Sequence, residues 1–405
     1  MIILALRNLS RHRRRTAVVL AAIGFGVVAL LLVGGFMEWS FWGMREGTIM
    51  SRLGHIQMTR PDYFENGSAD PYAYLLPDEL HDQLNIEDIP QIENISPRLF
   101  ISGLVSHGDV SIGFIGEGVD PEKDKALSEN LTITRGRQLS ADDPNGMLLG
   151  GGLARNMGVS VGDVIVLLTS TMSGGLNGVE GTVRGFFQSA SKEFDDAALL
   201  LPLDTAKQLL RVTGTHTWVL ILDQTEHTDP VLQELRSRYP DEAAQVQFTP
   251  WYNLADFYNK TIELFSRQMN IVRIIVAMII ILGISNALIM SVMERTGEIG
   301  TLLAIGYKRR MILQLFVSEG LLLGVTGGML GVVVGLILAH IISAIGIPMP
   351  PPPGMDIGFS GEIIVTWSLT AGVLLLAVAT TLLGSLYPAW KASRMVIVDA
   401  LRHNR

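Results

Sequence analysis

The sequence predicts a membrane protein with four transmembrane helices, one before and three after a large extracytoplasmic α+β domain. Three observations indicate this fold class. First, the 405-residue chain has a mean hydropathy of +0.35 and only 17% charged residues, which is too apolar for an ordinary soluble protein. Second, apolar residues concentrate in four runs long enough to cross a bilayer. Third, basic residues concentrate beside those runs, whereas acidic residues concentrate between the first run and the second.

The four apolar runs cover residues 16–37, 267–293, 311–345 and 363–387. The first has about 22 residues and reaches about 33 Å as a helix, at about 1.5 Å per residue, which is enough to cross the hydrocarbon core. A cleavable signal peptide also begins with basic residues and an apolar stretch. Here Glu38 and Trp39 follow the run in place of a small-residue cleavage site, so we expect a retained helix.

Charge gives the expected orientation. The predicted cytoplasmic pieces are residues 1–15, 294–310 and 388–405, and they hold 13 of the 31 basic residues. Only 4 of the 39 acidic residues lie in these pieces or at the adjacent membrane edge. Because positive flanks stay in the cytoplasm, we expect both termini inside and residues 38–266 outside.

Residues 38–266 are expected to form an α+β domain, as one body or as two subdomains. Short β-type runs alternate there with helical patterns. Strands are predicted at 55–58, 112–115, 164–168, 182–187, 198–201 and 217–222, and helices at 77–85 and 230–238. An amphipathic stretch at 251–268 is expected to continue without a break into the second span; its stripe is Leu254, Phe257, Tyr258, Ile262 and Phe265.

The third span carries two files of glycines at four-residue spacing. They are Gly320, Gly324 and Gly328, and Gly327, Gly331 and Gly335. Such files let a neighbouring helix approach closely, either within one subunit or across a dimer. Residues 346–362 then form a proline-rich external loop, which we interpret as a rigid connector.

Charge returns abruptly after the second span, in ERTGEIGTLLAIGYKRR at residues 294–310. Read as a helix, this segment places Glu294, Glu298 and Leu302 on one face. The apolar residues expected to meet a partner protein are Ile299, Leu303, Ala304 and Ile305. A simple turn would need only a few polar residues, so we predict a short amphipathic helix that receives force from another protein.

The string E-R-T-x-E-I-G-x-x-x-A-x-G, from Glu294 to Gly306, resembles the coupling helix of FtsX-type ABC transporter permeases. This group contains the macrolide exporter MacB and the lipoprotein-releasing permeases LolC and LolE. The segment MLLGGGLARNMGVSVGDVIVLL and the strands after it resemble the periplasmic core domain of the same family. The tail resembles the family's terminal signature through Pro388, Lys391 to Arg394, and Ala400 to Arg402.

The resemblance implies a bacterial inner-membrane subunit of the mechanotransmission (type VII) class. It works with two copies of an ABC ATPase and with a second permease chain, identical or homologous. The residues expected to couple to the ATPase are Glu294, Arg295, Glu298, Ile299, Leu302, Leu303 and Gly306. ATP and Mg would belong to the partner, because this sequence has no G-x-x-x-x-G-K-[ST] loop. We therefore predict a non-catalytic chain without its own cofactor or metal site, and without a nucleic-acid partner.

Residues 169–181, TSTMSGGLNGVEG, read as a hairpin. In LolC-like permeases the loop at this place is a hook that captures a periplasmic carrier. Here the loop has no proline or aromatic residue; its apolar contacts are Met172, Leu176 and Val179. A carrier hook and a plain exposed hairpin both stay open, as does an adaptor in place of a carrier.

For substrate we expect extraction of a lipoprotein or lipid-like molecule from the outer leaflet of the inner membrane. A lateral gate for acyl chains would be formed by the outer ends of the first two spans, with Phe36, Met37, Trp39, Phe257, Ile262, Phe265 and Met269. The alternatives are MacB-like efflux of drugs or peptides and FtsX-like signalling to a cell-wall hydrolase. His55 and His107 are expected to be structural residues and not ligands.

Overall fold

The computed structural model describes residues 11, 13–67, 69–80, 84–124, 131–189, 192–240, 245–349 and 359–396. The chain divides into two compact units. The helical unit contains Met1–Trp42, Thr261–Met349 and Phe359–Arg405, and the sheet unit contains Gly43–Lys260 with Pro350–Gly358. The predicted membrane fold class, with a large β-rich domain between the first and second spans, is confirmed.

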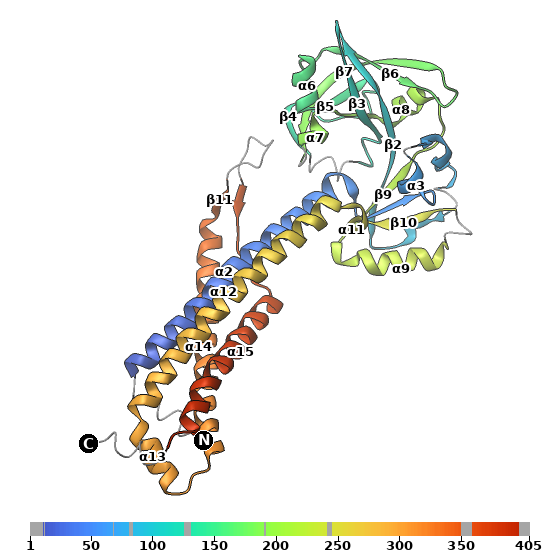
Figure 1. Ribbon diagram of the computed structural model, residues 1–405. Helices are drawn as coiled ribbons and strands as arrows, with labels where there is room; N and C mark the ends of the chain where they lie inside the picture. Colours follow the sequence, from blue (N-terminus) through green and yellow to red (C-terminus); the bar gives the residue numbers. More distant parts are fainter. Residues whose placement is uncertain are drawn as a thin grey trace. The chain divides into compact units, whose positions relative to one another are not determined.

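Four helices are long and apolar enough to cross a membrane (Figure 1). They are α2 (Arg13–Thr48), α12 (Asp256–Glu294), α14 (Arg309–Ile345) and α15 (Trp367–Ser393). The first two, at 36 and 39 residues, far exceed the 20 or so residues that a bilayer needs. The expected span limits inside these helices stay predictions. Most of the expected external loop, and the tail from residue 397, lie outside the described residues.

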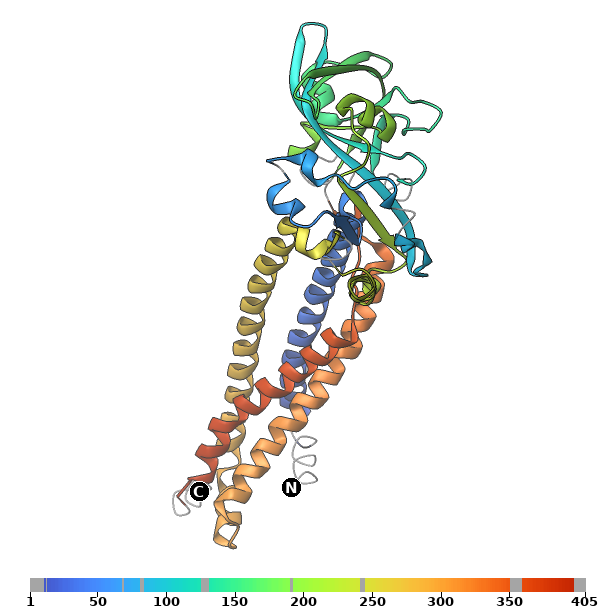
Figure 2. The same ribbon diagram turned by 90° about the vertical axis from the view of Figure 1, so that its right-hand side faces the viewer.

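The two glycine files of α14 pack inside this subunit. A Cβ atom at Gly324 or Gly320 would collide with Thr381 or Ser385 of α15, and Figure 2 shows α14 and α15 crossing side by side. On the other file, a Cβ at Gly331 would lie 2.7 Å from Val27 Cβ of α2. Each file therefore serves one neighbouring helix, and close packing against a second subunit is not needed to explain either.

The sheet unit is built on a 10-stranded sheet in the order β10-β1-β9-β2-β3-β8-β5-β7-β4, with β6 beside β2 and β7. The strands are β1 (Ile56–Thr59), β2 (Ile92–His107), β3 (Val110–Val119), β4 (Thr132–Gly136), β5 (Gly146–Gly150), β6 (Val164–Ser170), β7 (Leu176–Gln188), β8 (Ala198–Pro202), β9 (Thr217–Leu222) and β10 (Gln247–Pro250). Its helices are α3 (Tyr63–Asn66), α6 (Gly151–Met157), α7 (Lys192–Asp195), α8 (Leu203–Leu210), α9 (Thr228–Arg238) and α11 (Trp251–Leu254).

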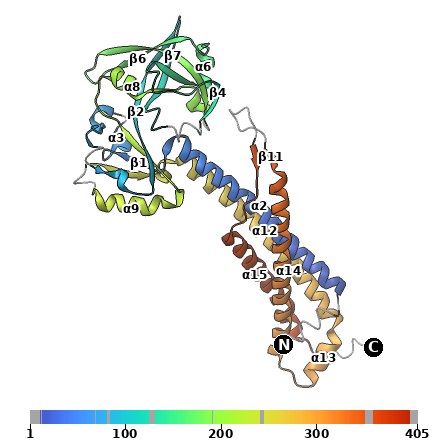
Figure 3. The ribbon, with the colours of Figure 1, turned by 180° about the vertical axis from the view of Figure 1, so that it is seen from behind.

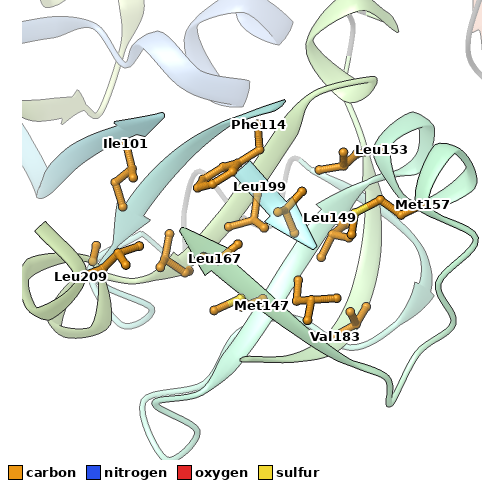
Figure 4. Packing of buried hydrophobic residues seen from close by; sticks show 14 of the residues in the cluster. Ile101, Phe114, Met147, Leu149, Leu153, Met157, Leu167, Val183, Leu199 and Leu209 are labelled. Carbon is orange, nitrogen blue, oxygen red and sulfur yellow. The ribbon is translucent and has the colours of Figure 1, made fainter. Parts of the chain in front are cut away.

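Strand β2 joins two hydrophobic cores within this unit. Its first half, up to Arg98, pairs with β9, and its second half pairs with β3 and β6. One core surrounds Trp218 and Phe248. The other gathers the aliphatic side chains of β5, β6, β7 and α6 around Phe114 (Figure 4). Arg98 lies where β2 changes partners, between the two cores.

All six predicted strands occur, and α9 confirms the helix predicted at 230–238. Strands β2, β4, β5 and β10 were missed. In β2 the residues Pro97 and Arg98 interrupt the apolar alternation that identifies a strand from sequence. The helix predicted at 77–85 was wrong at its start, where Pro77, Asp78 and Glu79 are not helical; residues 81–83 lie outside the described part.

The expected uninterrupted helix from residue 251 into the second span was also wrong. Helix α11 stops at Leu254, Ala255 takes φ −92° and ψ 56°, and α12 starts anew at Asp256. Burial explains the break, because Trp251 and Ala255 pack with Ile49 in a small core of their own. An unbroken helix would have placed these side chains at a different angle to that core.

Candidate functional site

The predicted coupling segment forms helix α13 (Thr296–Ala304), where α12 ends and α14 begins (Figure 3). Only Arg295 separates α12 from α13. The Thr296 hydroxyl donates back to the carbonyls of Val292 and Met293, at 3.0 and 2.8 Å, which fixes the junction. After the helix, Gly306 has φ +100°, a conformation that disfavours any side chain. The junction is therefore short and firmly defined at both ends.

Arg295 pairs with two carboxylates at this junction. Its guanidinium lies 3.1 Å from Glu319 Oε1 of α14 and donates to Glu298 Oε2 at 3.0 Å. Arg295 is 9% exposed and Glu319 is 2% exposed. Because buried charges are stable only when paired, Arg295 ties the end of α12 to α14.

Glu298 lies at the outer edge of these ion pairs. It accepts from Arg11 at 3.1 Å as well as from Arg295. The hydrogen bond from Arg295, with the positive charges of Arg295 and Arg11, lowers the pKa of the Glu298 carboxyl. Glu298 is therefore ionised at neutral pH while its side chain stays 48% exposed.

The apolar residues of α13 face inward. Ile299 is 2% exposed and packs in a core with Ile312, Phe316 and Ala389. Leu302 and Leu303 are half-buried against that core. Ile299 was expected to contact a partner protein, but it is too deeply buried to do so. Arg295 was expected to take part in the same contact and is also buried. These side chains hold α13 to α14 and α15.

The surface left free is an exposed tip, which we define as Thr301, Ala304, Ile305, Gly306, Tyr307, Lys308, Arg309 and Arg310. Within it Ile305 is 73% exposed. Three cations follow one another beside this apolar residue. Glu294 and Glu298, also exposed, lie near the start of α13. The sequence analysis placed Glu294, Glu298 and Gly306 in the site and expected Ala304 and Ile305 to meet a partner. It gave no partner-binding role to Tyr307 or to the three cations.

The residues expected to form one lateral gate lie in separate contacts in the structure. Phe36 stacks on Trp39 with ring centroids 5.9 Å apart, and both approach Gly361 of β12 (Phe359–Gly361). Phe265 instead meets Phe41, at 6.3 Å between centroids. Phe41 was missing from the expected set. The remaining members are Met37, Ile262 and Met269, which are half-buried, and Phe257, which is 78% exposed in the sheet unit.

The predicted hairpin exists but is shorter than expected. Its strands β6 and β7 pair as far as Ser170 and Leu176, so the turn covers only residues 171–175. The Tyr72 hydroxyl donates to the Ser170 carbonyl at 2.6 Å, and the Asn177 amide donates to the Leu209 carbonyl at 2.8 Å. These bonds fasten its base to the rest of the unit.

Two of the three apolar contacts expected on the hairpin remain on the surface. Met172 is 60% exposed and Leu176 is 83% exposed. Val179 is half-buried and packs against the main core of the sheet unit. A partner could therefore use Met172 and Leu176 without disturbing that core.

A second charged network lies inside the sheet unit, and sequence reasoning missed it. Arg98 of β2 lies 2.7 Å from Glu117 of β3 and 2.7 Å from Asp124. All three residues are at most 4% exposed. Arg52 donates to the other oxygen of Glu117, also at 2.7 Å. The strand that carries Arg98 was itself missed, so no signal in the sequence pointed to this network.

Arg52 connects this network to the end of the first helix. It lies on a π-helical turn (Ile49–Leu53) that follows α2 directly. Its guanidinium lies 4.7 Å from the ring centroid of Phe194 and 5.9 Å from that of Phe100, distances suited to cation–π attraction. Burial alone would raise the pKa of Glu117, but Arg52 and Arg98 together lower it. Glu117 is thus a buried carboxylate shared by two arginines.

Two buried histidines of the sheet unit are held as neutral rings. His216 Nδ1 accepts from the Phe100 N–H at 3.0 Å, while Nε2 lies 3.1 Å from the Pro71 carbonyl. His55 Nδ1 likewise accepts from the Leu222 N–H at 3.0 Å. Only the neutral tautomer with its proton on Nε2 satisfies both contacts of His216. Burial lowers the pKa of each imidazole to about 4.

These histidines make the sheet unit sensitive to acid. Since their pKa falls from 6.5 in the unfolded chain to about 4 in the fold, their contribution is complete above pH 6.5 and is lost as pH falls towards 4. We expect protonation of each histidine to lower the free energy of unfolding by at most about 3 kcal/mol between pH 6.5 and 4. Thermal unfolding of the purified chain between pH 7.5 and 4.5 measures this. The His55→Gln, His216→Gln double variant should be less stable at pH 7.5 but should show a flatter pH dependence; an equally steep curve would contradict this assignment.

Comparison with known proteins places the chain in a family. Residues 16–238 match the MacB-like periplasmic core domain, and residues 270–397 match the FtsX-like permease C-terminal domain. The periplasmic region of MacB from Actinobacillus actinomycetemcomitans, known from a crystal structure, aligns with 52% of this chain and 93% of its own, at 13% identity and a TM-score of 0.37.

Three relatives show the range of the family. The lipoprotein-releasing system transmembrane protein LolE of Haemophilus influenzae is 26% identical over 76% of this chain and 77% of its own. The macrolide export ATP-binding/permease protein MacB of Sodalis glossinidius is 26% identical over 98% of this chain and 60% of its own. An uncharacterised ABC transporter permease of Methanocaldococcus jannaschii is 27% identical over 67% of this chain and 65% of its own.

This chain therefore spans less than two thirds of the archaeal permease and of MacB. One matched domain is a permease C-terminal domain and the other is a periplasmic core domain, and together they include most of each apolar helix and most of the sheet unit. The segment from Glu294 to Gly306 lies inside the matched FtsX-like region. The chain belongs to the FtsX-like and MacB-like family of ABC transporter permeases, whose members include LolC and LolE.

Proposed function

We propose that this chain is the permease subunit of an inner-membrane ABC transporter whose ATPase is a separate subunit. In this proposal α13 and both termini are cytoplasmic, and the sheet unit is extracytoplasmic, as the distribution of basic residues favours. Two ATPases dock on the exposed tips of two permease chains. Closure of the ATPases around ATP draws the tips together, and the sheet units move in response.

The observation that carries this proposal is the junction at Arg295. Helix α12 runs unbroken for 39 residues from the sheet unit to Glu294, and one residue later α13 begins. The buried pair of Arg295 with Glu319 fixes α13, α12 and α14 to one another. A push on the exposed tip therefore moves α12 as a lever and is not absorbed by a flexible loop.

For the substrate we propose a lipoprotein or lipid-like molecule taken from the outer leaflet. LolE and LolC relatives, named for lipoprotein release, align with 76–78% of this chain. The contact of Phe265 with Phe41 supplies an aromatic entry for acyl chains at the outer ends of α12 and α2. The exposed Met172 and Leu176 offer a contact for a periplasmic carrier or adaptor.

MacB-like efflux is a second candidate, because the MacB relative aligns with 98% of this chain. A reconstituted complex of the permease and its ATPase distinguishes the two candidates. We expect a diacylated or triacylated lipopeptide to stimulate ATP hydrolysis several-fold and a macrolide to leave it unchanged. Stimulation by the macrolide alone would favour the second candidate.

The same assay tests the gate. Replacing Phe265 and Met269 together by serine should abolish stimulation by the lipopeptide, because the apolar contact with acyl chains is lost. Basal hydrolysis and recovery of the complex should not change, since both side chains lie far from α13 along α12. The matched control is Trp367→Ser, which removes another aromatic ring, 85% exposed, at the start of α15. Stimulation that survives the double substitution would remove these residues from the gate.

A further inference from the structure

Helix α15 contains a proline in its interior, Pro388. Because proline has no N–H group, the carbonyl of Gly384, four residues earlier, cannot accept the usual helical hydrogen bond. A carbonyl without a partner is costly in a membrane helix, since hydrocarbon offers no donor. Gly384 is buried in the helical unit, so its carbonyl needs a donor from the protein.

A serine of α12 supplies that donor. The Ser285 hydroxyl donates to the Gly384 carbonyl at 2.7 Å, across 99 residues of sequence. A serine or threonine in a helix commonly donates to a carbonyl three or four places earlier in its own helix. Thr380 and Ser385 do so within α15, at 2.8 and 2.7 Å. Ser285 instead bonds to a neighbouring helix, at the carbonyl that the proline deprives of its donor.

The missing side chain of Gly384 makes this contact possible. An added Cβ atom would lie 3.0 Å from the carbonyl oxygen of Ile281 and 3.3 Å from the Cβ of Ile284, both on α12. The two helices therefore approach closely at the same residue whose carbonyl Ser285 satisfies. Packing alone would explain the glycine, but it does not explain a hydroxyl that donates to this carbonyl.

The segment of α15 that follows the proline packs against α13. Ala389 and Ala392 are fully buried in one core with Ile299 of α13. A proline weakens a helix and lets it bend at that point. The angle between residues 388–393 and the rest of α15 therefore depends on the contacts that hold the bend, and a change of that angle would move the surface on which α13 rests.

We propose that Ser285 is a positioning residue. Its hydrogen bond to Gly384, which we call the latch, holds a hinge at Pro388 and keeps residues 388–393 aligned with α12. A movement of α13 is then carried by α12 and α15 together and is not lost in a bend of α15. The latch itself does not depend on the proposed function, whereas its use in coupling to an ATPase rests on that function.

Distances between spin labels in the full chain in liposomes, without an ATPase, test the latch. The sequence has no cysteine, so labels can be placed in pairs at exposed positions. The first pair reports on the segment beyond the hinge, at Met293→Cys and Lys391→Cys, and the second lies before it, at Met278→Cys and Leu375→Cys. We expect Ser285→Ala to raise the population of a second distance in the first pair about threefold to tenfold. The second pair should not change.

The proline provides the matched control. Pro388→Ala restores an N–H group that can donate to the Gly384 carbonyl, so adding Ser285→Ala to the Pro388→Ala chain should have no further effect. Thr380→Val also removes a hydroxyl, but one that donates within α15, and should leave both pairs unchanged. An unchanged first pair in Ser285→Ala, or an equal effect of this substitution with and without the proline, would overturn the latch.

The use of the latch in coupling is measured separately, in the reconstituted complex. Ser285→Ala should lower lipopeptide-stimulated ATP hydrolysis about threefold and should leave recovery of the ATPase unchanged, because the exposed tip is intact. Stimulation equal to that of the unsubstituted complex would overturn the role in coupling. If lipopeptide does not stimulate even the unsubstituted complex, the proposed function fails, while the spin-label distances still decide whether the latch exists.

Discussion

Replacing Glu319 by leucine is expected to lower the stability of the helical unit by about 3–5 kcal/mol, because it leaves the buried Arg295 guanidinium without the carboxylate of α14. Arg295 is 9% exposed and lies 3.1 Å from Glu319. Its remaining contact with Glu298 is at the surface. We expect thermal unfolding at a markedly lower temperature and loss of the ATPase on copurification, since α13 is no longer held in place.

Two variants separate this effect from a general loss of charge. The double substitution Arg295→Met, Glu319→Leu removes both ions and should recover most of the lost stability, as apolar replacements of buried ion pairs often do. Arg11→Gln breaks only the exposed pair of Arg11 with Glu298, whose side chains are 72% and 48% exposed, and should cost less than about 1 kcal/mol. If Glu319→Leu behaves like Arg11→Gln, the pair does not hold the junction.

The second large effect is expected at Glu117. Glu117→Leu leaves Arg98 fully buried with Asp124 alone and removes the carboxylate that Arg52 reaches from the end of the first helix. The free energy of unfolding of the sheet unit should again fall by about 3–5 kcal/mol. This corresponds to a decrease of roughly 10 °C in the unfolding temperature of a domain of about 200 residues. Differential scanning calorimetry of the full chain measures it.

An exposed ion pair of the same unit is the control. Lys192→Gln removes an i,i+4 pair with Asp196 whose side chains are 60% and 37% exposed, and should cost no more than about 0.5 kcal/mol. Arg52→Lys adds a test of the link to the first helix. It keeps the charge but loses the planar stacking on Phe194, so we expect reduced transport with near-normal basal ATP hydrolysis. Equal effects of Glu117→Leu and Lys192→Gln would show that the network is not structural.

The membrane helices and the short helix α13 after the second of them could be predicted from the sequence because their signals are local. Runs of 20 or more apolar residues exclude other folds, and the charges at residues 294–310 stand out against them. The glycine files predicted close packing of α14, but not its partners. Contacts with α2 and α15 depend on how the bundle is arranged, which a single helix does not encode.

The internal networks could not be predicted, because their members are distant in sequence. Arg52 and Glu117 are 65 residues apart, and Arg295 and Glu319 are 24 apart. The periodicity of α13 identified an apolar face around Ile299, but periodicity does not say what covers that face. In the structure α14 and α15 cover Ile299, so of the apolar residues expected to meet a partner only Ala304 and Ile305, in the exposed tip, are exposed.

The central claim is that the ATPase docks on that tip, and site-specific photo-cross-linking in intact cells tests it most directly. A photoreactive amino acid at Ile305, which is 73% exposed, is compared with one at Trp367, which is 85% exposed at the start of α15. We predict adducts with the ATPase at position 305 that increase when ATP hydrolysis is blocked, and none at position 367. No ATPase adduct at 305, or equal adducts at both positions, would contradict the account.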